Sequence, residues 1–266
     1  MSTSSRRTLL ALPAALALAA CGGDPLRAGP SASPTPREPL LVLAASDLQY
    51  AMSDVAAEYE RTGRRKPTLT FGSTGTFASQ IKNGAPADLF FAADQSFLAD
   101  LDAAGLVLPG TRHLYAAGRI TLAAARGAPV EAASLADLLR PEVKKVAIAN
   151  PEHAPYGQAA QQALQATGLW ERVQPKLVLA ENISQTFQLV QTGNADAGIV
   201  ALSIVLGAPG ATYTLIDAAL HAPLRQAAAV LKASRQPDAA RAFLAFVNGP
   251  LGRPTMKRYG FVLPGE

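Results

Sequence analysis

The chain has 266 residues, of which 49% are hydrophobic, so it can bury the core of one large or two medium-sized domains. Its formal net charge of +4 at pH 7 is too small and too evenly spread for a nucleic-acid-binding protein. The single cysteine excludes an internal disulfide and a cysteine-based metal site, and no apolar run after the N-terminal one is long enough to cross a membrane.

The first 20 residues have the pattern of an export signal. Arg6 and Arg7 are followed by an apolar run, residues 8–20, which is too short to span a bilayer and ends in small residues. The sequence Leu-Ala-Ala-Cys that ends at Cys21 resembles a bacterial lipobox, which implies cleavage and lipid attachment at this cysteine. A buried structural cysteine is the alternative. The arginine pair also resembles a twin-arginine signal, and an ordinary export signal stays open beside it.

Residues 21–38 are rich in Gly, Pro and Ser, with few large apolar residues, and predict a disordered tether. Beyond it, the predicted strands are residues 40–45, 68–71, 88–92, 120–124, 146–149, 197–200 and 224–231. The predicted helices are residues 47–61, 77–82, 94–101 with Asp94 as N-cap, 135–139, 157–166, 184–192, 237–248 with Ser234 or Asp238 as N-cap, and 250–258. This alternation predicts an α/β architecture with largely parallel sheets.

Two of the predicted strands are followed at once by hydroxyl side chains and a helix. Ser46 and Asp47 follow the first strand, and Ser73 and Thr74 follow the second. The start of a helix carries about half a positive charge and free N–H groups, so two such starts aimed at one point would cradle an anion. Neither loop contains Lys or Arg. Plain N-capping is the alternative explanation of the same residue types.

Seven segments, taken in order, resemble the signature segments of periplasmic molybdate-binding proteins: residues 44–48, 71–76, 84–94, 150–157, 180–183, 195–200 and 257–261. The resemblance implies an α/β fold of the type II periplasmic-binding-protein class, with two α/β lobes joined by a two-strand hinge around a ligand cleft. It places lobe 1 at residues 39–117 and 215–266, and lobe 2 at residues 118–214. A lipoprotein signal peptide at residues 1–20 and the tether at residues 21–38 precede them.

The resemblance also implies a set of ligand-binding residues. The two side-chain hydroxyls fall on Ser46 and Thr74, and two backbone amides fall on Asp47 and Ile183. A further donor falls on Tyr156, where some family members offer a backbone amide and others a tyrosine hydroxyl. Ser73 replaces Thr74 if the alignment is shifted by one residue. The resemblance implies no bare metal ion; molybdenum would be present only within the molybdate oxyanion. The oxygens of this anion would be contacted by Ser46, Thr74, Tyr156 and Ile183.

The chain departs from the family pattern at two positions. Ala201 stands where some members have a ligand tyrosine, so we expect Tyr156 to supply the missing phenol from another loop. Asp47 is an acid beside the expected anion, which it would repel. We therefore expect its side chain to point outward as a helix cap, whereas an inward side chain would argue against oxyanion binding. His153 is expected to be a turn residue near the cleft.

The resemblance implies capture of molybdate and tungstate outside the inner membrane and delivery to the membrane permease of an ABC importer. A monomeric, periplasmic protein anchored through a lipid on Cys21 is expected, with no cofactor and no nucleic-acid partner. No catalytic residues are assigned, because no nucleophile–base pair or metal cluster is visible. The alternatives are a receptor for sulfate or a carboxylate and a non-transport sensor on the same fold. A carboxylate receptor would normally place an arginine in the cleft loops, and these contain none.

Overall fold

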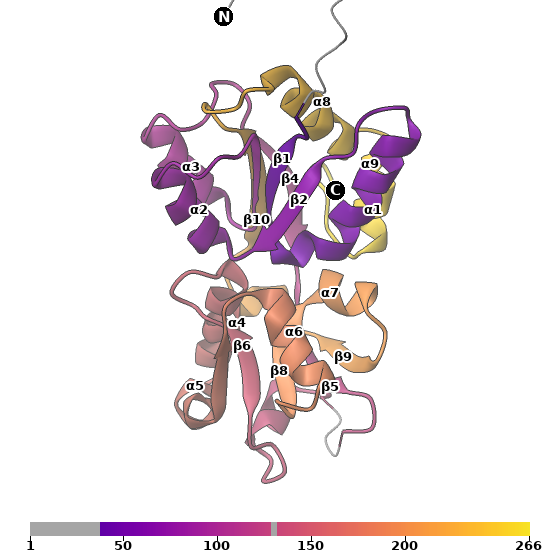
Figure 1. Cartoon of the computed structure of the whole chain (residues 1–266). Coiled ribbons are helices and arrows are strands. Elements are labelled where there is room, and N and C mark those ends of the chain that lie inside the picture. Colours follow the sequence, from indigo (N-terminus) through magenta and orange to yellow (C-terminus); the bar gives the residue numbers. More distant parts are fainter. Residues whose placement is uncertain (1–37, 129–131) are drawn as a thin grey trace, which may run out of the picture. The chain divides into compact units, whose positions relative to one another are not determined.

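A computed structural model describes residues 38–128 and 132–266, so the export signal, Cys21 and residues 21–37 of the tether lie outside the described residues. The described chain forms two five-stranded sheets, in the orders β2-β1-β3-β10-β4 and β7-β6-β8-β5-β9. Each sheet and its helices form a lobe, the first above the second in Figure 1. Within the described ranges, no helix combines the length and the apolar character needed to cross a membrane.

The first lobe is built on a mixed sheet. In it, β1 pairs in parallel with β2 and β3, whereas β10 runs antiparallel to β3 and β4. Its strands are β1 (Leu41–Ala45), β2 (Thr68–Gly72), β3 (Leu89–Ala92), β4 (His113–Gly118) and β10 (Leu224–Val230). Its helices are the 3-10 turn η1 (Ser46–Leu48), α1 (Gln49–Arg61), α2 (Thr74–Lys82), α3 (Gln95–Ala103), α8 (Pro237–Val247) and α9 (Gly252–Arg258).

The second lobe repeats this pattern, with β6 parallel to β7 and β8, and β5 antiparallel to β8 and β9. Its strands are β5 (Ile120–Ala125), β6 (Val146–Ala149), β7 (Leu177–Ala180), β8 (Ala197–Ala201) and β9 (Ala211–Leu215). Its helices are α4 (Pro155–Ala166), α5 (Trp170–Val173), α6 (Ile183–Gln191) and α7 (Leu202–Gly207). Short 3-10 turns are η2 (Leu135–Leu139) and η3 (Gln174–Lys176), and η4 (Ala218–Leu220) lies on the return to the first lobe.

The chain crosses between the lobes twice, once from β4 to β5 and once from β9 to β10, and these crossings are the hinge (Figure 1). Gly118 pairs with Leu224 in the first sheet, and Leu215 pairs with Thr121 in the second. Strand pairing therefore assigns these two residues to the lobes opposite to those expected from the resemblance. The β4–β5 crossing is tied to the first lobe by the Arg119 guanidinium, which donates to Gly260 O at 3.1 Å.

The core of the first lobe lies on both faces of its sheet. Phe91 points to one face, where its ring meets Tyr115 and Phe243 edge-on with centroids 5.3 and 6.4 Å apart. Phe90 points to the other face and meets Phe77. Both phenylalanines are fully buried, as their adjacent apolar positions in a central strand require.

Three sequence-based expectations about the secondary structure are wrong. The sheets are mixed rather than largely parallel, because β10 and β5 each run against their neighbours. The edge strands β4 and β9 were not predicted, because their partly exposed polar residues interrupt the apolar run typical of a central strand. The edge strand β7 was not predicted either, although its sequence Leu-Val-Leu-Ala is an apolar run. The N-cap of α8 is Gln236 and not Ser234 or Asp238, because Pro237 occupies the first helical position. The Asp94 cap is confirmed, with its carboxylate accepting from Ser96 N at 2.7 Å.

Gly157 lets the first turn of α4 lie directly on the end of β6. A side-chain carbon at this position would collide with the carbonyl oxygen of Ala149 and lie 2.7 Å from its carbonyl carbon. Because backbone atoms cannot move aside as a side chain can, only glycine allows this approach. The approach fixes the start of the helix that carries Tyr156.

We expect Gly157→Ala to lower the free energy of unfolding by about 1–3 kcal/mol, the usual cost of overpacking. Urea unfolding followed by circular dichroism measures the change. Gln165→Ala, on the exposed face of the same helix, is the control and should stay within about 0.5 kcal/mol of the wild type. A Gly157→Ala protein as stable as the control would contradict the close packing of α4 on β6.

Candidate functional site

A small cavity lies at the junction of the two lobes. The first lobe contributes the loops after β1, β2 and β3, and the second contributes the starts of α4 and α6. Its volume is about 10 Å³, the space for roughly one water-sized sphere, far below the ≈ 300–1,000 Å³ of pockets for drug-sized ligands. The cavity therefore suits a small ion and excludes a sugar or a nucleotide.

Helix starts surround this cavity. Thr74, Pro155 and Ile183 are the first residues of α2, α4 and α6, and all three line it. The Asn182 side chain accepts from Ser184 N and Gln185 N at 3.1 Å, which leaves the Ile183 N–H without a partner among the described residues. No lysine or arginine lines the cavity. The positive potential at this site therefore comes from free backbone N–H groups and from helix dipoles. Anions that bind at helix N-termini are held by the same groups.

Two hydroxyl groups at the cavity are available to a ligand. Thr74 Oγ1 accepts from Ala93 N at 3.0 Å, and no acceptor for its own proton lies among the residues that the structure describes. The Ser46 hydroxyl makes no hydrogen bond within the same ranges, although both residues are buried. Ser73 is different, because its Oγ donates to His153 O at 2.8 Å and lies 2.9 Å from His153 Nδ1. The geometry thus favours Thr74 over Ser73 as the second hydroxyl.

Asp47 corrects an expectation. Its side chain does not point outward as a cap; it is 1% exposed and lines the cavity. Its Oδ2 accepts from Gln226 Nε2 at 2.7 Å and from Tyr156 Oη at 3.0 Å. Burial raises the pKa of the Asp47 carboxyl to about 6, although the bonds from Gln226 and Tyr156 oppose the rise. Loss of water outweighs the two donors, because no cation faces the group.

Tyr156 reaches the cavity from the second lobe, as expected, but its phenol is engaged. Its Oη donates to Asp47 Oδ2 and accepts from Gln226 Nε2 at 3.0 Å. Burial, followed by the nearby Asp47 charge, raises the pKa of Tyr156 well above its usual value, so the phenol keeps its proton. The sequence reasoning missed Gln226. Its signal was a carboxamide at the start of the buried run of β10, after the exposed Arg225 and directly before three alanines and a valine.

Contacts between the lobes close the rim of the cavity. Gly75 N donates to His153 O at 2.9 Å beside the Ser73–His153 pair, which places His153 at the cleft in a turn as expected. On the other side, Ser184 Oγ donates to Ser46 O at 2.9 Å and Ser203 Oγ to Asp47 O at 2.7 Å. The structure therefore shows the lobes in contact on two sides of the cavity.

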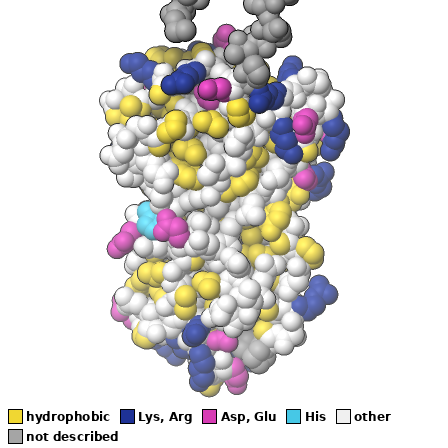
Figure 2. Space-filling view, viewed as in Figure 1, with side chains coloured by type: hydrophobic (Ala, Val, Ile, Leu, Met, Phe, Trp, Pro, Cys, Tyr) yellow, Lys and Arg dark blue, Asp and Glu magenta, His cyan; other side chains and the backbone are white. Residues whose placement is uncertain are grey.

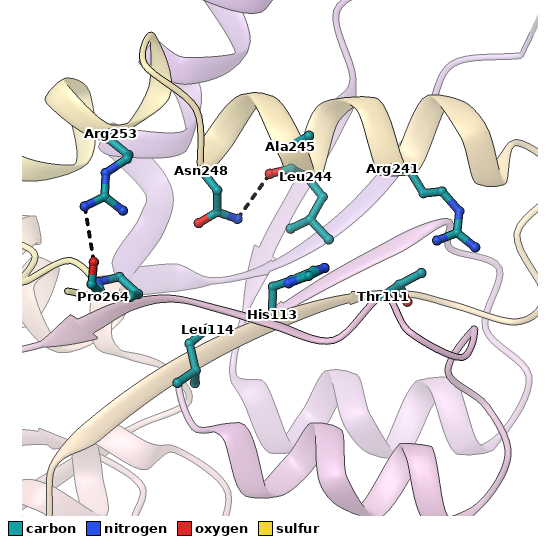
Figure 3. Close-up of a pocket in the computed structure, with 9 residues that line it drawn as sticks. All are labelled: Thr111, His113, Leu114, Arg241, Leu244, Ala245, Asn248, Arg253 and Pro264. Carbon is teal, nitrogen blue, oxygen red and sulfur yellow. Dashed lines mark hydrogen bonds between the residues drawn. The ribbon is translucent and has the colours of Figure 1, made fainter.

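A larger cavity of about 460 Å³ lies within the first lobe, between β4 and α8 (Figure 3). Arg241 and His113 face it, but Arg253 turns to Pro264 O, to which it donates at 3.3 Å. Only one lobe lines it, and hinge motion would not close it.

On the face shown in Figure 2, the Lys and Arg side chains lie over the lobes rather than at their junction. The small inter-lobe cavity is the candidate site.

The raised pKa of Asp47 predicts how stability depends on pH. Between about pH 4 and 6 the folded chain holds a proton here that the unfolded chain releases, so the free energy of unfolding falls as pH rises. The full fall is about 3 kcal/mol. Urea unfolding of the wild type and Asp47→Asn from pH 4 to 8 should show this loss in the wild type only. If the free energy of unfolding changes with pH in the same way in both proteins, the carboxyl of Asp47 is not buried without a cation beside it.

Comparisons with known proteins agree with this geometry. The molybdate-binding protein ModA of Rhodobacter capsulatus is 35% identical over 255 residues, covering 96% of this chain and 94% of that protein. ModA of Azotobacter vinelandii is 37% identical, covering 84% and 89%. The solved periplasmic molybdate-binding protein of Azotobacter vinelandii superimposes with a TM-score of 0.81 at 30% identity, covering 85% of this chain and 99% of that one.

A family model described as bacterial extracellular solute-binding protein matches residues 40–262. This range takes in both lobes, both hinge crossings and every residue that lines the inter-lobe cavity. By sequence and by fold, the chain belongs to the family of bacterial extracellular solute-binding proteins.

Proposed function

We propose that this protein captures molybdate, and tungstate with it, outside the inner membrane and passes it to the membrane permease of an ABC importer. The observation that carries the proposal is the inter-lobe cavity, where helix starts and hydroxyls from both lobes converge and which no Lys or Arg side chain lines. The names of the relatives supply the identity of the anion. No chemical step is involved, since capture and release are the whole activity.

The proposed donors are the hydroxyls of Ser46 and Thr74 and the N–H groups of Ile183 and Asp47. The Tyr156 phenol gives its one proton to Asp47 Oδ2, so it joins this set as a donor only by releasing that bond. The donors come from both lobes, so the set is complete only when the lobes are closed. An anion that fits poorly would leave buried donors unsatisfied, at about 1–3 kcal/mol each. Selectivity would therefore come from the size of the cavity.

The proposal includes a location and an assembly. The lipobox-like sequence at Cys21 supports a periplasmic protein held at the membrane by a lipid on this residue, after removal of residues 1–20. The relatives are solute-binding proteins, which supports a partner permease in the membrane. The proposal includes a receptor that works as a monomer. No cofactor is assigned, and among the described residues there is no group of three or more His, Cys, Asp or Glu placed to hold a metal ion.

A panel of anions tests the choice of ligand. Molybdate and tungstate should raise the melting temperature of the purified protein, because a ligand that binds only the folded state stabilises it. Sulfate, phosphate and a small carboxylate such as acetate should raise it much less at the same concentration. A larger shift with sulfate or the carboxylate would replace the proposed ligand with that anion.

Thr74→Ala tests the site itself. Removing a donor that only the ligand satisfies should weaken molybdate binding by about 5- to 150-fold, as measured by isothermal titration calorimetry. Ser53→Ala is the matched control, since the Ser53 hydroxyl lies exposed on α1 and bonds only to Gln49 O. An affinity as high in Thr74→Ala as in the control would remove Thr74 from the site.

A further inference from the structure

Three buried polar side chains from three elements meet beside the cavity. Asp47 comes from η1, Tyr156 from α4 of the second lobe and Gln226 from β10, the strand that returns from the hinge. Gln226 Nε2 lies 2.7 Å from Asp47 Oδ2 and 3.0 Å from Tyr156 Oη, so one amide group joins both partners. We call these residues the hinge-side cluster.

Gln226 is an unusual residue for its place. It is 0% exposed in a strand whose next four residues are Ala, Ala, Ala and Val. Burying a carboxamide costs free energy unless its polar atoms are paired, and Gln226 Oε1 has no partner among the described residues. An apolar side chain would suit the core better. The benefit of the glutamine must therefore come from the two contacts that its Nε2 makes.

Those contacts act on the one acid in the site. Asp47 is the single charged side chain that lines the cavity, and its Oδ1 is also buried without a partner in the described part of the chain. A bare carboxylate here would repel an anion at short range, in surroundings that screen charge poorly. The Gln226 amide and the Tyr156 hydroxyl both donate to Oδ2, which draws the negative charge toward the hinge side.

The backbone beside the cluster is shaped to admit it. Gly118 ends β4 and pairs with Leu224 of β10 at the hinge. A side-chain carbon on Gly118 would collide with Tyr156 Oη and lie 2.8 Å from Gln226 Nε2. Tyr156 of the second lobe can therefore reach the first lobe only because residue 118 has no side chain. The cluster thus needs both the hinge strands and closed lobes.

We propose that Gln226 is a positioning residue of the anion site, which holds the Asp47 carboxylate and the Tyr156 phenol together when the lobes close. It turns the charge of Asp47 away from the guest and orients the phenol. The inference rests on the proposed function, because it concerns the same cavity. It adds a residue that does not itself touch the anion, and it explains how an acid is tolerated there.

A double-mutant cycle on molybdate affinity, measured by calorimetry at pH 8, tests the role. Gln226→Met keeps the length of the side chain and removes the amide, so it should weaken binding by about tenfold or more while Asp47 is present. In the Asp47→Asn background, with no charge to offset, the same change should cost less than about threefold. Gln165→Met, exposed on α4, should leave the affinity unchanged. Equal losses in both backgrounds would show a merely structural glutamine and overturn the inference.

Gly118→Ala addresses the same cluster if Gln226→Met does not fold. It should also weaken binding by about tenfold or more, and more in the wild-type than in the Asp47→Asn background. Wild-type affinity in Gly118→Ala would overturn the inference.

If the wild type does not bind molybdate, the proposed ligand is wrong, and the cycle is repeated with the anion that gave the largest thermal shift. Failure of the wild type to bind any anion would overturn both proposals.

Discussion

The proposed binding of an anion between the lobes, in a cavity lined by no Lys or Arg, is the constraint on which the rest of this structure depends. Such a site can use only dipoles, and each dipole must be brought to one point by the fold. Here the starts of α2, α4 and α6 and the turn after β1 meet at one place between the lobes. Parallel strands direct their carboxyl ends and the following helix starts to one edge of the sheet, so the mixed sheets keep parallel strands where the ligand loops leave.

The same constraint explains why the binding groups are divided between lobes. A complete shell of donors around a small ion would leave no path of entry if one rigid lobe carried it. Dividing the shell lets the ion enter an open cleft and become enclosed when the lobes meet, with the hinge crossings absorbing the motion. The rim contacts of His153 with Ser73 and of Ser184 with Ser46 are of the kind that favours the closed arrangement.

Asp47 is the feature that sets this chain's site apart from a simple dipole cradle. An acid in such a cavity is tolerated only if its charge is drawn aside or removed by a proton. The structure provides for both, through the donors Gln226 and Tyr156 and through a carboxyl pKa raised by burial. If Gln226 has the proposed role, binding, lobe closure and the state of this acid are coupled in one cluster at the hinge.

The sequence by itself determined the α/β class, the central strands and the hydroxyls at their ends, because apolar runs and cap residues are local signals. Ser46, Thr74, Tyr156 and Ile183 all line the cavity where the family resemblance put them. Only the tertiary structure decided the antiparallel edges, the inward turn of Asp47 and the role of Gln226. These depend on contacts between residues up to 179 positions apart, such as Asp47 and Gln226, and no local pattern encodes which distant side chain will supply a donor.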